Sequence, residues 1–295
     1  ASATMKTYTT EPQIGGSYIY RCVVSPTNGC ASDISEPIEV KVYDDLISGT
    51  ISADQTICYN TQPDALTLIE NPTGGDGAYT YQWQQSHDNT TWTDIEGATT
   101  TTFQPNALSI TTYYRLNVSS LCGEAQTSTI KINVRPDVTA PVINSITDSI
   151  CYNTQPNNFS IITEATGGED DTFTYHWYES VNGVSFNAIE GETSLTYQPK
   201  ALAAEHYYKV VAISANGCGE RSSNVEKVKV FDDLAIETIG TAPLCYMTSG
   251  EIKISASGEG NNYKYQWQEL VGATYQDIAS ATMKTYTTEP QIGGS

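Results

Sequence analysis

Short stretches of alternating apolar and polar residues, each closed by a turn-rich segment, dominate this chain. In the stretch AYTYQWQ, Tyr79, Tyr81 and Trp83 fall on one face of an extended strand, and Thr80 and Gln82 fall on the other. Turn clusters such as NPTGGDG and ATGGEDD separate these stretches, and no long segment repeats its apolar residues at the helical period of 3.6. The pattern therefore predicts an all-β chain of short strands.

Three related units carry these strands. ICYNTQPDALTLI begins at Ile57, ICYNTQPNNFSII begins at Ile150, and LCYMTSGEIKISA begins at Leu244. A Gly- and Asp-rich loop and then an aromatic strand follow each of these segments. Self-similarity of this kind is the signature of a repeat architecture, so the repeat sets the domain organisation.

The aromatic residues of the units are equally spaced. Tyr114 lies 31 positions after Trp83, and Tyr208 lies 31 positions after Trp177. Trp267 opens the corresponding interval in the third unit, but the printed sequence stops before the interval closes. The third unit is therefore incomplete at this end of the chain.

The two ends of the chain explain the incomplete unit. Residues 1–17 and 279–295 are identical at an offset of 278 positions, and at that offset Tyr20 would stand 31 positions after Trp267. The N-terminal segment thus has the sequence of the second half of the third unit. We divide the chain into the C-terminal half of a repeat (1–46), two whole repeats (47–138 and 139–234) and the N-terminal half of a repeat (235–295), which together make a three-domain period of 278 residues.

Each whole unit contains about seven short strands, which is typical of an immunoglobulin-like sandwich. We therefore expect an all-β chain of tandem immunoglobulin-like β-sandwiches in an extended, beads-on-a-string array. The strand tryptophans and the tyrosines that follow them are the expected core residues: Trp83, Trp177, Trp267, Tyr114, Tyr208 and Tyr20.

The charge of the chain limits the classes of partner that it can bind. The formal net charge is −20, from 34 acidic and 14 basic residues. Nucleic-acid binding requires clustered Lys and Arg, so we expect no nucleic-acid partner. Anionic membrane surfaces are disfavoured for the same reason, and no apolar run reaches the ~20 residues of a membrane helix, so we expect no direct membrane insertion in this segment.

Six of the seven cysteines occupy matched positions, one before the second strand and one in the last hairpin of each unit. A zinc site needs clustered ligands, which these distant cysteines and the three histidines do not offer. We instead expect one disulfide in each unit, stabilising by about 4 kcal/mol and implying an oxidising compartment, with the strand tryptophan packed on it. The expected pairs are Cys58 with Cys122, Cys151 with Cys218, and Cys245 with the next copy of Cys30.

Cys22 is left over from this scheme. It aligns with Leu116 and Val210 on an inward-facing register, which predicts a buried and inert thiol. An intermolecular bridge is the alternative.

Candidate chemistry is sparse. His87, His176 and His206 each lack the Ser or Cys nucleophile and the orienting acid of a catalytic triad, so we expect no enzyme.

Paired aspartates at two of the unit junctions, in the segments VYDDL and VFDDL, offer oxygen ligands for Ca²⁺, and a solvated linker is the alternative interpretation. The third junction, VRPDV, lacks the pair, and no other cofactor is expected. The aspartates concerned are Asp44, Asp45, Asp232 and Asp233.

The motifs ICYNTQP, YTYQW, IEGAT and TTYYR resemble the immunoglobulin- or PKD-like repeats of very large Bacteroidota surface proteins. Among these are the gliding-motility adhesins of the SprB type, which the type IX secretion system exports. The resemblance covers the whole chain. It implies secretion, anchorage to the cell surface through a terminal region outside this segment, and a role as a stalk or adhesin.

We therefore expect a structural stalk or filament segment of a secreted adhesin, located at the cell surface. Its partners would be neighbouring repeats, and surface glycans or other cells. The alternative is a carbohydrate-binding or accessory module array of an extracellular enzyme, with a matched aromatic platform on one outer face of every unit. Exposed sheet edges leave open a second question, whether copies are joined covalently or by strand exchange.

Overall fold

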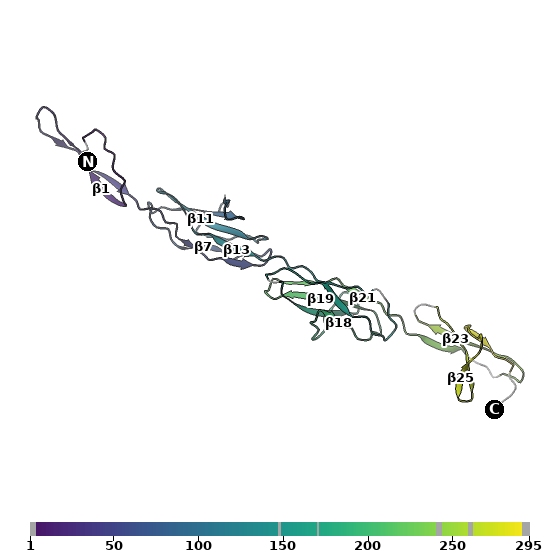
Figure 1. Cartoon of the computed structure of the whole chain (residues 1–295). Helices are drawn as coiled ribbons and strands as arrows, with labels where there is room; N and C mark the ends of the chain where they lie inside the picture. The colour runs from purple at the N-terminus through teal and green to yellow at the C-terminus, as the bar shows by residue number, and fades with distance from the viewer. Residues whose placement is uncertain (1–3, 147–148, 170, 240–243, 259–261, 291–295) are drawn as a thin grey trace. The chain divides into compact units, whose positions relative to one another are not determined.

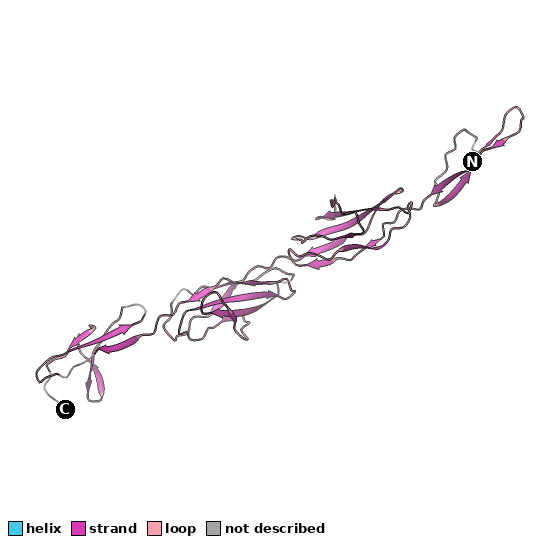
Figure 2. Ribbon diagram, turned by 180° about the vertical axis from the view of Figure 1, so that it is seen from behind, coloured by secondary structure: helices cyan, strands magenta, loops and turns pink. Residues whose placement is uncertain are grey.

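A computed structural model describes residues 4–146, 149–169, 171–239, 244–258 and 262–290. The regular structure in these residues is entirely β, in 26 short strands (Figure 1, Figure 2). The chain divides into two compact units, the first formed by residues 1–137 with 167–170 and the second by residues 138–166 with 171–295. The prediction of an all-β chain is confirmed.

The first unit contains a two-sheet sandwich, which we call the first sandwich. Its smaller sheet has the order β10–β7–β5, and its larger sheet has the order β6–β13–β11–β8–β9, with β12 also paired to β11. The strands are β5 (Thr50–Ile51), β6 (Gln55–Ile57), β7 (Leu66–Glu70), β8 (Thr80–Ser86), β9 (Thr93–Asp94), β10 (Thr102–Phe103), β11 (Thr112–Ser120), β12 (Gly123–Gln126) and β13 (Ile130–Val134).

The strand order of the first sandwich is immunoglobulin-like. β5 pairs antiparallel with β7 in the smaller sheet, whereas β6 pairs parallel with β13 in the larger sheet, where Ile57 lies opposite Val134. The segment that runs from β5 to β6 therefore crosses from one sheet to the other. With β7 and β10 in one sheet and β8, β11 and β13 in the other, this arrangement is the two-sheet division of an immunoglobulin-like sandwich.

The core of the first sandwich lies between its two sheets. Trp83 on β8 lies opposite Leu116 on β11, and both side chains are fully buried, as is Leu66 from the facing sheet. Along β11 the buried residues alternate with partly exposed ones, so Tyr114 and Val118 also face inward. This alternation is the period-2 pattern seen in the sequence.

The second unit repeats the design in a second sandwich. One sheet has the order β14–β15–β18, and the other has the order β17–β16–β19–β20, with β21 paired to β19. Ile150 forms a parallel bridge with Val230, in the place of the parallel pair formed by β6 and β13. The strands are β14 (Val142–Ile143), β15 (Phe159–Thr163), β16 (Phe173–Ser180), β17 (Asn187–Ala188), β18 (Thr196–Tyr197), β19 (His206–Ser214), β20 (Glu220–Ser222) and β21 (Glu226–Val228).

The second core is built from residues at matched positions. Trp177 lies opposite Val210, and both are fully buried. The ring of Phe159 lies 6.1 Å from that of Trp177 and 5.1 Å from that of Tyr208, between ring centroids. Tilted aromatic contacts at these distances add to the stability that burial alone supplies.

The chain contains further strands outside the two sandwiches. In the first unit β1 pairs with β4 and β2 pairs with β3; in the second unit β22, β23 and β26 form one sheet, and β24 pairs with β25. Tyr20 and Trp267, which belong to these segments, are half-buried. The strands are β1 (Gly16–Tyr20), β2 (Val23–Val24), β3 (Asp33–Ile34), β4 (Ile38–Val42), β22 (Ala235–Ile239), β23 (Glu251–Ser257), β24 (Gln268–Val271), β25 (Thr274–Asp277) and β26 (Thr285–Thr287).

Candidate functional site: the cysteine turns and hairpins

The seven cysteines fall into two chemical states. Cys58 and Cys218 are disulfide-bonded, and both are half-buried. The others are exposed free thiols: Cys22, Cys30, Cys122, Cys151 and Cys245. Cysteines at matched positions of the repeat therefore differ in oxidation state: some are disulfide-bonded and others are free thiols.

Cys58 begins a tight turn that the residues after it, Asn60 and Thr61, favour. Its carbonyl oxygen accepts hydrogen bonds from the backbone N–H of Thr61 at 3.2 Å and from the Thr61 hydroxyl at 2.7 Å. Asn60, inside the turn, has a φ of 55°, in the left-handed region that Asn tolerates better than most residues. The turn is anchored to the end of β13, since the Arg135 N–H donates to the Ile57 carbonyl at 2.9 Å.

The same turn recurs at the two matched cysteines. The carbonyl oxygen of Cys151 accepts bonds from the N–H of Thr154 at 3.2 Å and from its hydroxyl at 2.6 Å. The carbonyl oxygen of Cys245 accepts the corresponding bonds from Thr248 at 3.1 Å and 2.6 Å. We call these three structures the cysteine turns, at residues 58–61, 151–154 and 245–248.

The other matched cysteines lie at hairpin tips. Cys122 stands between β11 and β12, where Ser120 lies opposite Gly123. Cys218 stands in the longer loop between β19 and β20, which the N–H of Ser214 closes by donating to the Gly219 carbonyl at 3.0 Å. We call these the hairpin cysteines, together with Cys30 between β2 and β3.

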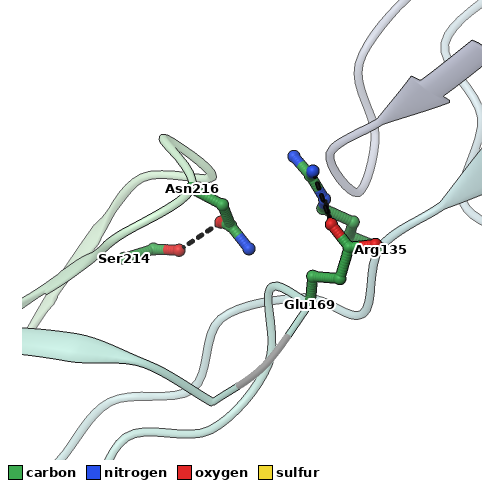
Figure 3. A network of polar contacts seen from close by, with 4 residues as sticks. All are labelled: Arg135, Glu169, Ser214 and Asn216. Carbon is green, nitrogen blue, oxygen red and sulfur yellow. Dashed lines mark hydrogen bonds and ion pairs between the residues drawn. The ribbon is translucent and has the colours of Figure 1, made fainter.

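Inside the second hairpin, the Ser214 hydroxyl donates to Oδ1 of Asn216 at 2.5 Å (Figure 3). This bond stabilises the loop that contains Cys218. It lies beyond the last backbone pair of β19 and β20, which is Ile213 with Glu220.

The predicted disulfide between Cys58 and Cys122 is wrong, because Cys122 is a free thiol. The two residues stand at opposite ends of the first sandwich. Cys58 lies beside the end of β13, where the Val134 N–H donates to the hydroxyl of Thr111, just before β11 begins. Cys122 follows the other end of β11, which at nine residues is ~30 Å long. A disulfide joins Cα atoms only ~4.4–6.8 Å apart.

The predicted disulfide between Cys151 and Cys218 is wrong for the same reason. Cys151 is free, and it follows the residue that bridges to Val230, near the start of β19. Cys218 lies beyond Ser214, at the other end of this nine-residue strand. The expected packing of Trp83 and Trp177 on these two disulfides is therefore wrong as well.

The third expected pair and the leftover thiol also differ from expectation. Cys30 and Cys245, predicted to pair across copies of the period, are both free in this chain. Cys22 is exposed and not buried. It aligns with Leu116 and Val210, which are buried because a second sheet covers them, and the sequence counterpart of that sheet lies in residues 235–295.

The paired aspartates do not assemble a metal site. The part of the chain that the structure describes contains no group of three or more His, Cys, Asp or Glu side chains placed to hold a metal ion. Asp44, Asp45, Asp232 and Asp233 are exposed. At the first junction it is the backbone that makes the contact, because the Asp44 carbonyl accepts a bond from the Gly75 N–H at 2.9 Å.

The junction that lacks paired aspartates has an ion pair of its own. Nε and Nη2 of Arg135 donate to Oε2 of Glu169 at 2.8 Å and 2.6 Å (Figure 3). The Gly168 N–H donates to the Pro136 carbonyl at 3.0 Å beside it. The Glu169 side chain is 48% exposed, so the pair contributes at most about 1 kcal/mol.

Trp92 and Phe186 each stand nine positions after the strand tryptophan of their sandwich, and each has a cation over its ring. The Arg115 guanidinium lies 4.3 Å from the Trp92 ring centroid and its Nε donates to Gln84 at 2.7 Å. In the second sandwich, Nζ of Lys209 lies 4.9 Å from the ring of Phe186. One face of each ring is therefore already occupied by a side chain of the same domain.

These features define a protein of tandem immunoglobulin-like domains. The family model described as a domain of unknown function, DUF8696, matches residues 47–136 and 141–232, and the chain belongs to this family. No curated protein matches the sequence. No helix in the described ranges is long and apolar enough to cross a membrane.

Solved structures of tandem domains show a distant similarity. Three titin domains align over 72% of this chain and 74% of theirs, with 12% identity and a TM-score of 0.37. Extracellular domains 3–5 of Drosophila OTK align over 83% of this chain and 87% of theirs, with 10% identity and a TM-score of 0.28. Immunoglobulin domains 1–5 of Sidekick-1 align over 81% of this chain and 50% of theirs, with 11% identity and a TM-score of 0.29.

Proposed function

We propose that this segment is a structural stalk, an array of immunoglobulin-like domains that displays other parts of a larger secreted surface protein. The observation that carries the proposal is the repetition of one core design. The strand tryptophan of each of the three sequence repeats donates its indole N–H to a backbone carbonyl. The acceptors are the carbonyls of Thr100, Ser194 and Met283. A packing design that recurs in every repeat supports a mechanical role, because the recurring contacts are those that hold a sandwich together.

The domain organisation we propose is the one expected from the repeat. Residues 47–138 and 139–234 would be whole domains, and 1–46 and 235–295 would be the second and first halves of a third. Two observations support this division. Residues 1–46 contain strands matching β11 to β13, and residues 235–295 contain strands matching β5 and β7 to β10. A continuous array of the 278-residue period would therefore complete a sandwich at each join.

The location we propose is the cell surface. The disulfide-bonded state of Cys58 and Cys218 supports an oxidising compartment. The resemblance to Bacteroidota repeats supports a stalk of the SprB type, exported by type IX secretion, with its neighbours in the array as direct partners. Contacts with glycans or other cells would be made by regions outside this segment.

A carbohydrate-binding array is the less favoured function. It requires an open aromatic platform, and the rings of Trp92 and Phe186 each lie under a cation. Stacking of a sugar on that face would first have to displace Arg115 or Lys209.

Electron cryomicroscopy of the native surface material tests the stalk. We expect a thin fibre with three globular densities in each period, repeating every ~110–130 Å if each sandwich is about ten strand residues long. Continuous density through the identical segments 1–17 and 279–295 would support one covalent chain. Separate particles whose half-domains pair between molecules would overturn the proposal in favour of strand exchange.

A further inference from the structure

We propose that residues 235–295 form a docking site for one partner, residues 18–46 of a second copy of this chain. The docked segment would supply the strand that β11 supplies in the first sandwich, and in an array the second copy would be the next period. The inference rests on the proposed function and deepens it, because it names the partner of the C-terminal half-domain and the register in which that partner binds.

The smaller sheet of a sandwich is already present in the C-terminal half. β23 pairs with β22 and with β26, as β7 pairs with β5 and with β10. Ile252 lies opposite Tyr286 in this sheet. At the matched positions of the first sandwich, Leu66 lies opposite Phe103. The hairpin of β24 and β25 matches that of β8 and β9, so this half holds one sheet and one hairpin of the other sheet.

Trp267 is held in this half by the same bonds that hold Trp83. Its backbone N–H donates to the Ala281 carbonyl at 2.9 Å, and its indole N–H donates to the Met283 carbonyl at 2.9 Å. The segment that carries the tryptophan is therefore positioned by contacts within residues 235–295 alone.

Space remains beside Trp267 where the first sandwich is filled. Two grooves border this residue, one of about 430 Å³ that Ile236 and Ile254 also line, and one of about 340 Å³ that Ile252 also lines. Trp83, in contrast, is fully buried. The described residues 262–267 form no strand, whereas the matched part of β8 pairs with β11. The structure therefore indicates an open sheet position next to Trp267.

The N-terminal half contains the strands that fit this position. β1 pairs with β4 in the register of β11 with β13, since Tyr20 lies opposite Ile38. At the matched positions, Tyr114 lies opposite Ile130. β2 and β3 likewise match the pairing of β11 with β12. Residues 16–42 thus form the part of the larger sheet that β11 to β13 form in the first sandwich.

The inward face of this N-terminal sheet is apolar and exposed. Val24 is 63% exposed and Ile38 is 64% exposed, whereas the matched Val118 and Ile130 are buried in the first core. Covering apolar surface of this kind is favourable, and contiguous exposed apolar surface is typical of interaction sites. The face is therefore a docking surface of the same size and pattern as one side of a sandwich core.

The duplicated segment identifies the partner as a copy of this chain. Tyr286 and Tyr8 occupy the same position of the 278-residue period, and Phe103 is their counterpart in the first sandwich. The Tyr286 ring lies 5.8 Å from that of Trp267, and the Tyr8 ring lies 6.1 Å from that of Tyr20. Phe103 makes both contacts at once, at 6.2 Å from the matched tryptophan and 5.9 Å from the matched tyrosine. On docking, Tyr286 takes the place of the second copy's Tyr8.

The register of the docked strand follows from β8 and β11. Trp83 lies opposite Leu116 in the first sandwich. The matched pair is Trp267 with Cys22 of the second copy. Cys22, an exposed thiol in this chain, would become buried at that position.

One cation would add specificity to the docked strand. Arg115 lies over the ring of Trp92, and the matched residues are Arg21 and Tyr275, whose ring is exposed. The register places Arg21 opposite Gln268, so its guanidinium would cover the Tyr275 ring of the first copy.

Sedimentation of the 295-residue chain over a range of concentrations tests the docking. At 0.15 M salt, repulsion between these acidic chains is screened beyond ~8 Å. We expect the average mass to rise with concentration. Val24→Asn should weaken association about tenfold or more, because it buries an amide in the core. Val23→Asn is the matched control, since its counterpart is Asn117 on the outer face, and it should change association less than about twofold.

Both valines are exposed in the single chain, so neither substitution disturbs the fold that precedes docking. A chain that stays monomeric at every concentration would overturn the proposal. Association that Val24→Asn leaves unchanged, or that non-reducing electrophoresis traces to disulfides between chains, would overturn it as well.

Alkylation of Cys22 gives an independent readout of the register. Its rate should fall about tenfold or more as the chains associate, because the thiol becomes buried. Cys30 lies at a hairpin tip and should keep its rate, which makes it the internal control. Equal rates for Cys22 and Cys30 in the associated chains would overturn the assigned register and with it the proposal.

The docking site and the stalk can fail separately. Docking in solution together with separate particles in the native material would overturn the stalk and keep the docking site. A continuous fibre in the native material, with purified chains that do not dock, would do the reverse.

Discussion

The indole Nε1 of Trp83 donates a hydrogen bond to the carbonyl oxygen of Thr100 at 3.0 Å, from the centre of a fully buried core. The backbone N–H of Trp83 donates to Ala98 at 2.9 Å. Trp177 repeats the indole contact with Ser194 at 2.8 Å. The tryptophan thus ties its own strand to the segment leading into the opposite sheet, while its ring fills the space between the sheets.

We predict that Trp83→Phe lowers the free energy of unfolding of the first sandwich by about 2–4 kcal/mol. The change removes buried volume and leaves the Thr100 carbonyl without its donor. Urea denaturation followed by circular dichroism measures the loss. Trp92→Phe is the matched control, since Trp92 is partly exposed under Arg115, and it should lose less than about 1 kcal/mol. Equal losses in the two variants would contradict the assignment.

Two glycines with similar backbone angles should respond differently to Ala. Gly49 and Gly97 have φ values of 78° and 74°, so each substitution carries the left-handed strain of about 1 kcal/mol. At Gly49 a Cβ would also lie 2.1 Å from the Glu70 carbonyl oxygen, whereas at Gly97 it meets nothing within 4 Å. We expect Gly49→Ala to shift the urea midpoint clearly further than Gly97→Ala. The reverse order would show that the β5–β7 contact yields at little cost.

The cysteine turn of the first sandwich depends on the residue at its left-handed position. Asn60→Gly should change the free energy of unfolding by less than about 0.5 kcal/mol, whereas Asn60→Val should lower it by about 1–2 kcal/mol because a β-branched residue resists a φ of 55°. Thermal denaturation of the oxidised chain compares the two variants. A Val variant as stable as the Gly variant would mean that the turn adopts another conformation.

The chain should lose stability at alkaline pH. Burial raises the pKa of Tyr114 to about 12, and burial with the nearby Glu179 and Glu192 raises the pKa of Tyr197 to about 12. A folded-state pKa above the unfolded value of ~10 gives stability that is complete below pH ~10 and is lost as the pH rises toward 12. Absorbance at 295 nm should show late-titrating tyrosines together with loss of structure by circular dichroism. Titration of all tyrosines near pH 10 in a folded chain would contradict this.

Several features of the fold could be predicted from single residues. The alternation around Trp83 predicts which side of β8 faces the core, because side chains on a strand alternate between its two faces. The spacing from Trp83 to Tyr114 anticipates two neighbouring strands, and these residues stand two positions apart in the register of β8 and β11, where Gln85 lies opposite Tyr114. Local pattern is sufficient here because the pairing joins strands within one domain.

The errors concern cysteines. Cys58 and Cys122 stand at matched places in a repeat, and such positions are equally compatible with pairing inside a domain and with pairing between domains. The length and direction of β11 exclude pairing inside the domain, because they place Cys58 and Cys122 at opposite ends of the sandwich. The predicted burial of Cys22 is wrong for a related reason, because an inward-facing strand position is buried only where a second sheet covers it.

The sequence by itself determined the β class, the repeat and the core residues Trp83 and Trp177, because these depend on side-chain alternation and on spacing along the chain. Only the tertiary structure decided which end of each sandwich carries the turn and which carries the hairpin. That choice depends on the parallel contact of β6 with β13, a pairing between residues more than seventy positions apart. Contacts between residues so far apart leave no local pattern in the sequence.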